Sequence, residues 1–258
     1  MTMFSHHGFE LSYADSGPEG AEPVLLVHGF ASSYRVNWLS PGWVRTLTEA
    51  GYRVVGFDHR GHGDSSKSYR PEDYTPENMA GDAAALLDHL GIRSAHVMGY
   101  SMGARVAAFL ALERPERVHT LILGGLGIGM ITGVGNWEEV AEALKAEDPE
   151  TIPDKRARMF RTFADQTKSD RRALAACIET SRTLITAADV GRIAQPTLVA
   201  VGTKDDIAGS GKELAVLMPD AEAFDIEGRD HMLSVGDPTF KRAALAFLRA
   251  HPIADDDR

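Results

Sequence analysis

The motif GYSMG at positions 99–103 places a serine, Ser101, between two glycines. It follows a short apolar run, residues 95–98, and precedes an alanine-rich segment of helical character. A sharp turn from strand to helix needs small residues two positions before and after its central residue. Such a turn exposes the serine hydroxyl and sets the amide of Met102 beside an incoming carbonyl group, at a helix N-terminus that favours negative charge. The motif therefore predicts a nucleophilic serine.

A serine hydroxyl is a weak nucleophile near neutral pH and needs a histidine base that a carboxylate orients. Of the ten histidines, only His231 lies in a loop after a late strand and before the last predicted helix. We therefore predict that His231 is the base. Asp230 adjoins it, but an immediate neighbour does not usually reach the imidazole in the right orientation.

The carboxylate is expected after the apolar run 197–201, where two aspartates are adjacent. The Gly-x-x-Asp spacing that starts at Gly202 favours Asp205. Asp206 is the alternative, and its expected role is to cap the following turn.

An oxyanion needs a second donor besides the amide of Met102. The segment His28-Gly29-Phe30 follows the apolar run 24–27 and supplies a suitable loop. We predict the amide of Phe30 as this donor. His28 and Gly29 close the turn that aims the amide, so His28 is expected to be structural.

The segment DHRGHGDS, which begins at Asp58, is a further dense motif. Asp58 and Arg60 are expected to tie this loop to neighbouring backbone. A metal site built from His59, His62 and Asp64 is the alternative. We favour the structural reading, because the chain already has its nucleophile and has no other His/Cys set with ligand spacing. Neither a metal nor a cofactor is expected.

The candidate site residues lie far apart in the chain, so the fold must bring their segments together. Short apolar runs alternate with helical patterns along the chain. The predicted strands are residues 9–13, 24–27, 53–57, 95–98, 118–123, 197–201 and 221–226. The predicted helices are residues 43–50, 76–90, 102–113, 212–218 and 238–249. Apolar strands separated by helices are typical of an α/β protein whose parallel sheet is covered on both faces.

The segment 126–190 breaks this alternation and contains helical patterns without a convincing strand. We predict that it is a helical cap inserted into a core domain made of residues 1–125 and 191–258. Candidate substrate-binding residues are apolar and lie near a motif or in the cap: Tyr100, Leu126, Ile128, Trp137 and Met232, then Phe30, Met130, Met159, Phe160 and Phe163. Ordinary helix packing is the alternative for the cap residues. A charged substrate is disfavoured, because no Arg or Lys of the cap can be placed inward.

The composition excludes several classes of protein. The chain has 258 residues, with 27 Lys or Arg against 37 Asp or Glu, so its formal net charge is −10. No basic face for nucleic acid and no basic amphipathic helix for a membrane surface is evident. The longest uncharged stretch, residues 118–137, carries six glycines and predicts a buried strand and a loop. The single cysteine, Cys177, and the absence of a signal-peptide pattern favour a cytoplasmic location.

Together, the motifs HGF, DHRGHGDS, GYSMG, VGTKD and GRDHM resemble, in order, those of the α/β-hydrolase fold family. The resemblance covers about residues 9–248 and is to serine esterase-like members with a short inserted cap. It implies a mostly parallel central sheet flanked by helices, with the cap inserted after the sixth strand. It also implies that Ser101 attacks an ester carbonyl, with His231 as base and Asp205 as its orienter.

The expected activity is hydrolysis of carboxylic esters of small to medium apolar acyl groups through an acyl-enzyme intermediate. The same triad serves carbon–carbon bond hydrolases, enol-lactonases and thioesterases, and the fold also serves ligand-binding receptors. Haloalkane dehalogenases and epoxide hydrolases are disfavoured, because they use an aspartate nucleophile. The expected partner is a small-molecule ester, with no nucleic acid and no membrane. The sequence leaves the oligomeric state open.

Overall fold

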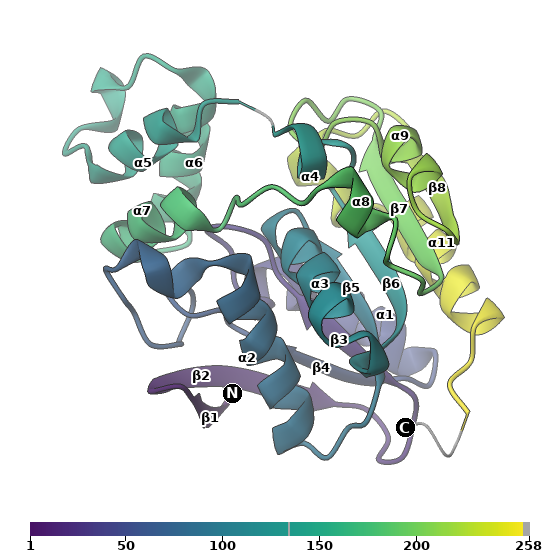
Figure 1. The fold of residues 1–258 in the computed structure, drawn as a ribbon. Helices are drawn as coiled ribbons and strands as arrows, with labels where there is room; N and C mark the ends of the chain where they lie inside the picture. Colours follow the sequence, from purple (N-terminus) through teal and green to yellow (C-terminus); the bar gives the residue numbers. More distant parts are fainter. Residues whose placement is uncertain (134, 255–258) are drawn as a thin grey trace.

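The computed structural model describes residues 1–133 and 135–254, and its centre is a single eight-stranded sheet (Figure 1). The strand order is β1-β2-β4-β3-β5-β6-β7-β8. The strands are β1 (Thr2–His6), β2 (Phe9–Ser16), β3 (Pro23–Val27), β4 (Arg53–Phe57), β5 (Ala95–Tyr100), β6 (Val118–Gly124), β7 (Thr197–Gly202) and β8 (Ala221–Ile226). β2 runs antiparallel to both β1 and β4, and all other neighbours are parallel. This confirms the predicted mostly parallel sheet.

The helices of the core follow the strands, as expected for crossover connections between parallel strands. They are α1 (Trp43–Glu49), α2 (Pro76–His89), α3 (Met102–Glu113), α9 (Gly211–Val216), α10 (His231–Ser234) and α11 (Pro238–Ala250). Shorter turns are the π-helical η1 (Arg35–Leu39) and the 3₁₀-helical η2 (Pro71–Tyr74), η3 (Pro115–Arg117) and η4 (Pro149–Thr151).

Buried side chains of the central strands β3 to β7 divide between two hydrophobic clusters on opposite faces of the sheet. Leu25 packs with α2 and α3 residues in one cluster, whereas Leu26 packs with α1 and α11 residues in the other. Every residue of β3, β5 and β7 is buried, which explains why these strands read as continuous apolar runs.

The first strand, β1, was not expected from the sequence. It lies at the edge of the sheet, and only Phe4 of its five residues is buried. An edge strand of this kind is held mainly by backbone pairing with β2, so its sequence carries little hydrophobic pattern.

The described segment between β6 and β7 contains helices and no strand, which confirms the helical cap after the sixth strand. Its helices are α4 (Gly129–Thr132), α5 (Trp137–Lys145), α6 (Lys155–Gln166), α7 (Arg171–Thr180) and α8 (Ala187–Val190). Side chains of Asn136, Asp154 and Asp170 cap the N-termini of α5, α6 and α7. Figure 1 shows these three helices grouped together, whereas α4 and α8 lie next to the core. The exact cap boundaries stay a prediction.

The uncharged stretch that begins at residue 118 forms β6 and then α4, with residue 134 outside the described part. Over residues 1–133 and 135–254, no helix combines the length and the apolar character that crossing a bilayer demands.

Candidate active site

Ser101 occupies the turn between β5 and α3 in a strained backbone conformation. Its φ of 55° and ψ of −114° lie where residues other than glycine are rare. A Cβ atom at Gly99 would lie 2.2 Å from the carbonyl oxygen of Gly103, and one at Gly103 would lie 2.0 Å from that of Val27. Both glycines are therefore required by close packing of backbone around the serine.

The structure brings the three predicted side chains together at the carboxyl ends of the strands. His231 Nε2 lies 3.0 Å from Ser101 Oγ, and His231 Nδ1 lies 2.8 Å from Asp205 Oδ2. The Asp205 side chain is fully buried and the His231 side chain is 7% exposed. In such a chain of hydrogen bonds, Nδ1–H donates to the carboxylate and Nε2 accepts from the serine hydroxyl.

His231 begins the one-turn helix α10 instead of lying in a loop as predicted. The neighbouring Asp230 is the N-cap of this helix, and its carboxylate accepts from the amide of Leu233 at 2.8 Å. The Asp230 carboxylate is thus engaged within its own turn. This agrees with the prediction that Asp230 is not the acid that orients His231.

Asp205 also caps the turn that follows β7. Its Oδ1 accepts from the amides of Ile207 and Ala208, each at 2.9 Å, while Oδ2 contacts the imidazole. The capping role predicted for Asp206 is therefore wrong, because Asp205 already satisfies these amides. Asp206 is exposed and offers its backbone oxygen to Arg156 at 3.3 Å.

The His28-Gly29-Phe30 loop passes directly against the serine turn. A Cβ atom at Gly29 would lie 3.1 Å from the oxygen of Tyr100 and 3.5 Å from Ser101 Cβ. Among the described residues, the amides of Phe30 and Met102 donate to no acceptor within the chain. Both amides are thus unpaired at the positions predicted for oxyanion donors.

Asn37, in η1, was missed by sequence reasoning although it supports this loop. Its Oδ1 accepts from the amide of Gly29 at 3.0 Å. The residue is 5% exposed, lines the pocket at the serine, and its Nδ2 has no partner in the described part of the chain. A lone asparagine in an irregular turn carries no sequence pattern that would have revealed it.

His28 has the structural role that the sequence predicts. Its Nδ1 donates to the oxygen of Gly29 at 2.8 Å, and its Nε2 accepts from the amide of His59 at 3.0 Å. The rings of His28, His59 and His62 pack edge to face and are fully buried. Burial lowers the pKa of His28 to about 4 and that of His62 to about 3, and it holds the pKa of His59 well below its ordinary value.

The DHRGHGDS loop is tied to neighbouring backbone as predicted. Asp58 accepts from the amides of Tyr34 at 2.7 Å and Asp64 at 2.9 Å. Arg60 donates to the oxygen of Asp73 at 2.9 Å and to both carboxylate oxygens of Asp82. Within the part of the chain that the structure describes, no three His, Cys, Asp or Glu side chains are grouped to hold a metal ion.

A pocket of about 260 Å³ opens at Ser101. Its walls come from both the core and the cap: Gly29, Phe30, Ser32, Val36, Asn37, Pro41, Tyr100, Ser101, Phe160, Phe163, His231, Met232 and Val235. Of the predicted substrate-binding residues, Tyr100 and Met232 line it, together with Phe30, Phe160 and Phe163 from the wider set. The hydroxyl of Tyr100 also donates to the backbone oxygen of His231.

The other predicted substrate-binding residues do not line this pocket. Leu126 and Met130 are buried in the hydrophobic core, and Ile128 is the N-terminal cap residue of α4. Trp137 packs against Phe160 but does not itself line the pocket, and Met159 lines a different cavity. Apolar residues in a cap serve both packing and binding, so residue type alone does not separate the two.

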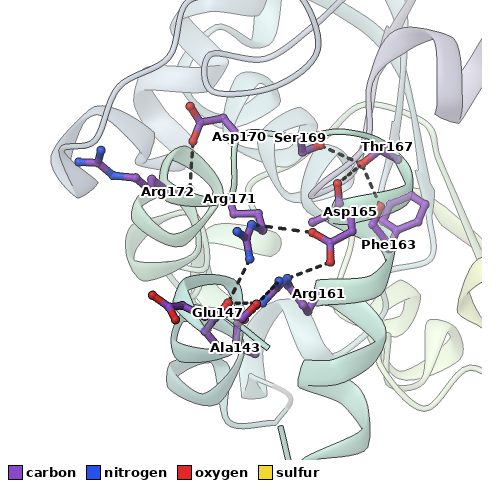
Figure 2. Close-up of polar contacts among 12 residues, drawn as sticks. Ala143, Glu147, Arg161, Phe163, Asp165, Thr167, Ser169, Asp170, Arg171 and Arg172 are labelled. Carbon is purple, nitrogen blue, oxygen red and sulfur yellow. Dashed lines mark hydrogen bonds and ion pairs between the residues drawn. The ribbon is translucent and has the colours of Figure 1, made fainter. Parts of the chain in front are cut away.

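The end of α6 holds the cap against the loop that carries Phe30. Figure 2 shows Thr167 beside Phe163 and Ser169 in the turn between α6 and α7. Thr167 Oγ1 lies 3.2 Å from the backbone oxygen of Ala31, which has a φ of 57°. The cap thereby touches the strained residue next to the predicted oxyanion donor.

A mostly parallel sheet with a serine on a strand-to-helix turn, hydrogen-bonded to a histidine, is the architecture of a large class of hydrolases. A family model described as the alpha/beta hydrolase fold matches residues 22–152, and the chain belongs to this family.

Two curated relatives are dihydrolipoyllysine-residue acetyltransferase components of acetoin cleaving systems. That of Cupriavidus necator is 41% identical over 128 residues, which are 50% of this chain and 30% of the relative. That of Pseudomonas putida is 32% identical over 93% of this chain and 67% of the relative. Among solved structures, a hydrolase from Pseudomonas aeruginosa is 26% identical with a TM-score of 0.80, covering 95% of this chain and 97% of that one. The chain thus spans about a third of the first relative's length and two thirds of the second's.

Proposed function

We propose that the protein is a serine hydrolase that cleaves carboxylic esters of small to medium apolar acyl groups. The observation that carries the proposal is the continuous hydrogen-bonded chain from Ser101 Oγ through His231 to the buried carboxylate of Asp205. Two unpaired amides lie beside it, those of Phe30 and Met102.

In the proposed reaction, Ser101 Oγ attacks the ester carbonyl carbon while His231 Nε2 accepts the hydroxyl proton. The carbonyl oxygen becomes an anion and accepts from the amides of Phe30 and Met102. His231 then gives its proton to the departing alcohol, which leaves an acyl group on Ser101. Water attacks this acyl-enzyme with His231 again as base, and the acid is released. Asp205 holds the imidazole orientation and stabilises its charged form throughout.

The size and lining of the pocket support the proposed acyl group. A volume of about 260 Å³ is small for a ligand pocket, and Phe30, Phe160 and Phe163 contribute apolar walls. A small-molecule ester as the partner and a cytoplasmic location belong to the same proposal; Cys177 is buried and free.

The test is an assay of p-nitrophenyl esters from acetate to octanoate with wild type and Ser101→Ala. We expect the short esters to be preferred. We also expect the variant to lose at least about a thousandfold in kcat, because the nucleophile is gone. Unchanged turnover in the variant would show that Ser101 is not the nucleophile.

A wild-type enzyme that ignores simple esters but cleaves a lactone, a thioester or a vinylogous diketone would shift the assignment to one of those reactions. Ligand binding without turnover on any substrate of the panel would instead favour a receptor.

A further inference from the structure

Tyr100 connects the turn that carries Ser101 to the helix that carries His231. It is the last residue of β5 and directly precedes the serine. Its hydroxyl donates to the backbone oxygen of His231, which lies 131 residues further along the chain. The rings of Tyr100 and His231 lie 5.5 Å apart between their centres, at an interplanar angle of 47°. The tyrosine therefore joins the two segments whose relative position sets the distance between the serine and the imidazole.

The helix α10 depends on contacts with the rest of the chain. It has only four residues, and a helix of this length is not stable in water by itself. Its ends are fixed by the N-cap Asp230 and by Trp43, whose Nε1 donates to the oxygen of Val235 at 2.6 Å. Of the side chains that the structure describes, only Tyr100 is hydrogen-bonded to the backbone of His231 itself.

The Tyr100 hydroxyl belongs to a buried group of hydrogen bonds on the inner side of α10. Ser234 is fully buried, forms a side-chain hydrogen bond with Tyr100, and has its Oγ 2.7 Å from the backbone oxygen of Asp230. Burial, and then the charge of Asp205, raise the pKa of Tyr100 well above its ordinary value. The hydroxyl therefore keeps its proton near neutral pH and remains a donor.

Two consecutive glycines make room for the ring of Tyr100. A Cβ atom at Gly124 would lie 2.8 Å from Tyr100 Cδ2, and one at Gly125 would lie 2.6 Å from Tyr100 Cζ. The ring thus packs directly on backbone at the end of β6, where the amide of Ser101 donates to the oxygen of Gly124 at 2.8 Å. This packing fixes the ring, and so it also fixes the point from which the hydroxyl donates.

We propose that Tyr100 is a positioning residue for the reaction: its hydroxyl holds the backbone of His231 at the distance from Ser101 that proton transfer requires. This inference rests on the proposed function. It gives Tyr100 a role beyond the substrate contact predicted from the sequence, since the ring lines the pocket while the hydroxyl is turned to the histidine backbone.

The role of Tyr100 differs from that of Asp205. The contact of Asp205 Oδ2 with Nδ1 sets the direction of the imidazole, whereas Tyr100 holds the backbone from which the imidazole extends. His231 Nε2 lies 3.0 Å from Ser101 Oγ. A backbone shift of about 1 Å would lengthen or misalign this hydrogen bond, and a misplacement of that size can reduce a rate severely.

The experiment compares wild type with Tyr100→Phe on p-nitrophenyl butyrate. Phenylalanine keeps the ring against the two glycines and removes only the hydroxyl. We expect kcat to fall by about tenfold or more and KM to stay within about twofold, because the pocket wall is kept while the base is less well aligned.

The matched control is Tyr74→Phe. Tyr74 is also fully buried, and its hydroxyl donates to the backbone oxygen of Ser68 at 2.6 Å, but it does not line the pocket at Ser101. Each variant loses one buried hydrogen bond, so we expect both Tm values to fall by about 2–4 °C. The kcat of Tyr74→Phe should stay within about twofold of wild type. An unchanged kcat in Tyr100→Phe, or equal losses of kcat in the two variants, would overturn the proposal.

A second arm separates the positioning role from the choice of an ester as substrate. An alkyl fluorophosphonate reacts with an activated serine without needing the natural substrate. Ser101 Oγ bonds to phosphorus, fluoride leaves, and His231 accepts the hydroxyl proton. We expect Tyr100→Phe to be labelled at least about fivefold more slowly than wild type and Tyr74→Phe.

The two arms distinguish the failure of either proposal. Slower labelling of Tyr100→Phe, in a protein whose wild type cleaves no ester, would support the positioning role and refute the esterase. Ester turnover with equal labelling and equal kcat in all three proteins would do the reverse. A wild type that is neither labelled at Ser101 nor active on esters would refute both.

Discussion

At the scale of single residues, Ser101 holds a conformation that its own side chain disfavours. The positive φ of 55° costs about 1–3 kcal/mol for a residue with a Cβ atom. The surrounding backbone imposes this conformation, because Gly99 and Gly103 allow the strand, the helix and the His28-Gly29 loop to meet around it. The site is therefore built at a cost in stability.

Replacing Ser101 by glycine should release this strain. We expect Ser101→Gly to be about 1 kcal/mol more stable than Ser101→Ala, because alanine keeps the Cβ atom and glycine does not. Both variants should be inactive. Urea unfolding of the two variants side by side measures the difference, and a less stable glycine variant would contradict the strain.

A second residue-scale prediction concerns Asn37, whose side-chain oxygen accepts a hydrogen bond from the amide of Gly29. We expect Asn37→Ala to lower kcat by about tenfold with a smaller effect on KM, because the loop carrying the Phe30 amide loses its support. The control is Ser33→Ala, which removes a hydroxyl that accepts from Val36 in the same turn. A kcat equal in both variants and wild type would refute the supporting role.

At the scale of elements, α6 carries pocket residues on one side and an anchoring arginine on the other. Figure 2 shows Arg161 joined to Asp165 of its own helix and to backbone at the end of α5. Arg161 is 3% exposed, and it donates to the oxygens of Ala143, Ala146 and Glu147. These carbonyls have no further helical turn to pair with, so the arginine closes α5 and holds α6 against it.

We expect Arg161→Met to weaken the cap by about 1–3 kcal/mol, because several carbonyls lose their donor. Phe160 and Phe163 lie on the same helix, so KM should rise while the chemistry of acylation is kept. Hydrogen exchange should show faster exchange over α5 and α6 and unchanged exchange in β5. Arg192→Met, at an exposed arginine, serves as control, and a uniform change in both variants would argue against a local role.

At the scale of the whole molecule, buried neutral histidines couple stability to pH. Burial lowers the pKa of His28 and His96 to about 4 and that of His62 to about 3, against 6.5 for an ordinary histidine. Below pH 6.5 the unfolded chain binds protons that the native state does not bind. The free energy of unfolding must therefore fall as the pH decreases from about 6.5 towards 4.

Each of these histidines should contribute a slope of up to about 1.4 kcal/mol per pH unit in this range. We expect His62→Gln to have a shallower decline between pH 6 and pH 5 than wild type, by roughly one proton. Urea unfolding at several pH values measures the slopes, and parallel curves for wild type and His62→Gln would refute the prediction.

The sequence by itself was sufficient for the fold class. It also singled out Ser101, His231 and Asp205, whose side chains lie within hydrogen-bond distance of one another in the structure. The reason is local: a strand that must turn sharply into a helix requires glycines at set positions, and apolar runs reveal buried parallel strands. Strand ends that lie in one row then bring the three side chains to the same edge. The edge strand β1 was not predicted from the sequence, because only one of its side chains is buried.

Only the tertiary structure determined which residues line the pocket at Ser101 and which groups surround the charged side chains. Asn37 supports the oxyanion loop from an irregular turn eight residues away. Phe160 and Phe163 of the cap line the pocket at Ser101 of the core, although they are far from Ser101 in the chain. Asp205, and not Asp206, caps the turn after β7. One oxygen of its carboxylate accepts from the amides of that turn, and the other contacts the imidazole of His231. Such contacts depend on the relative placement of cap and core, which no local pattern of residues encodes.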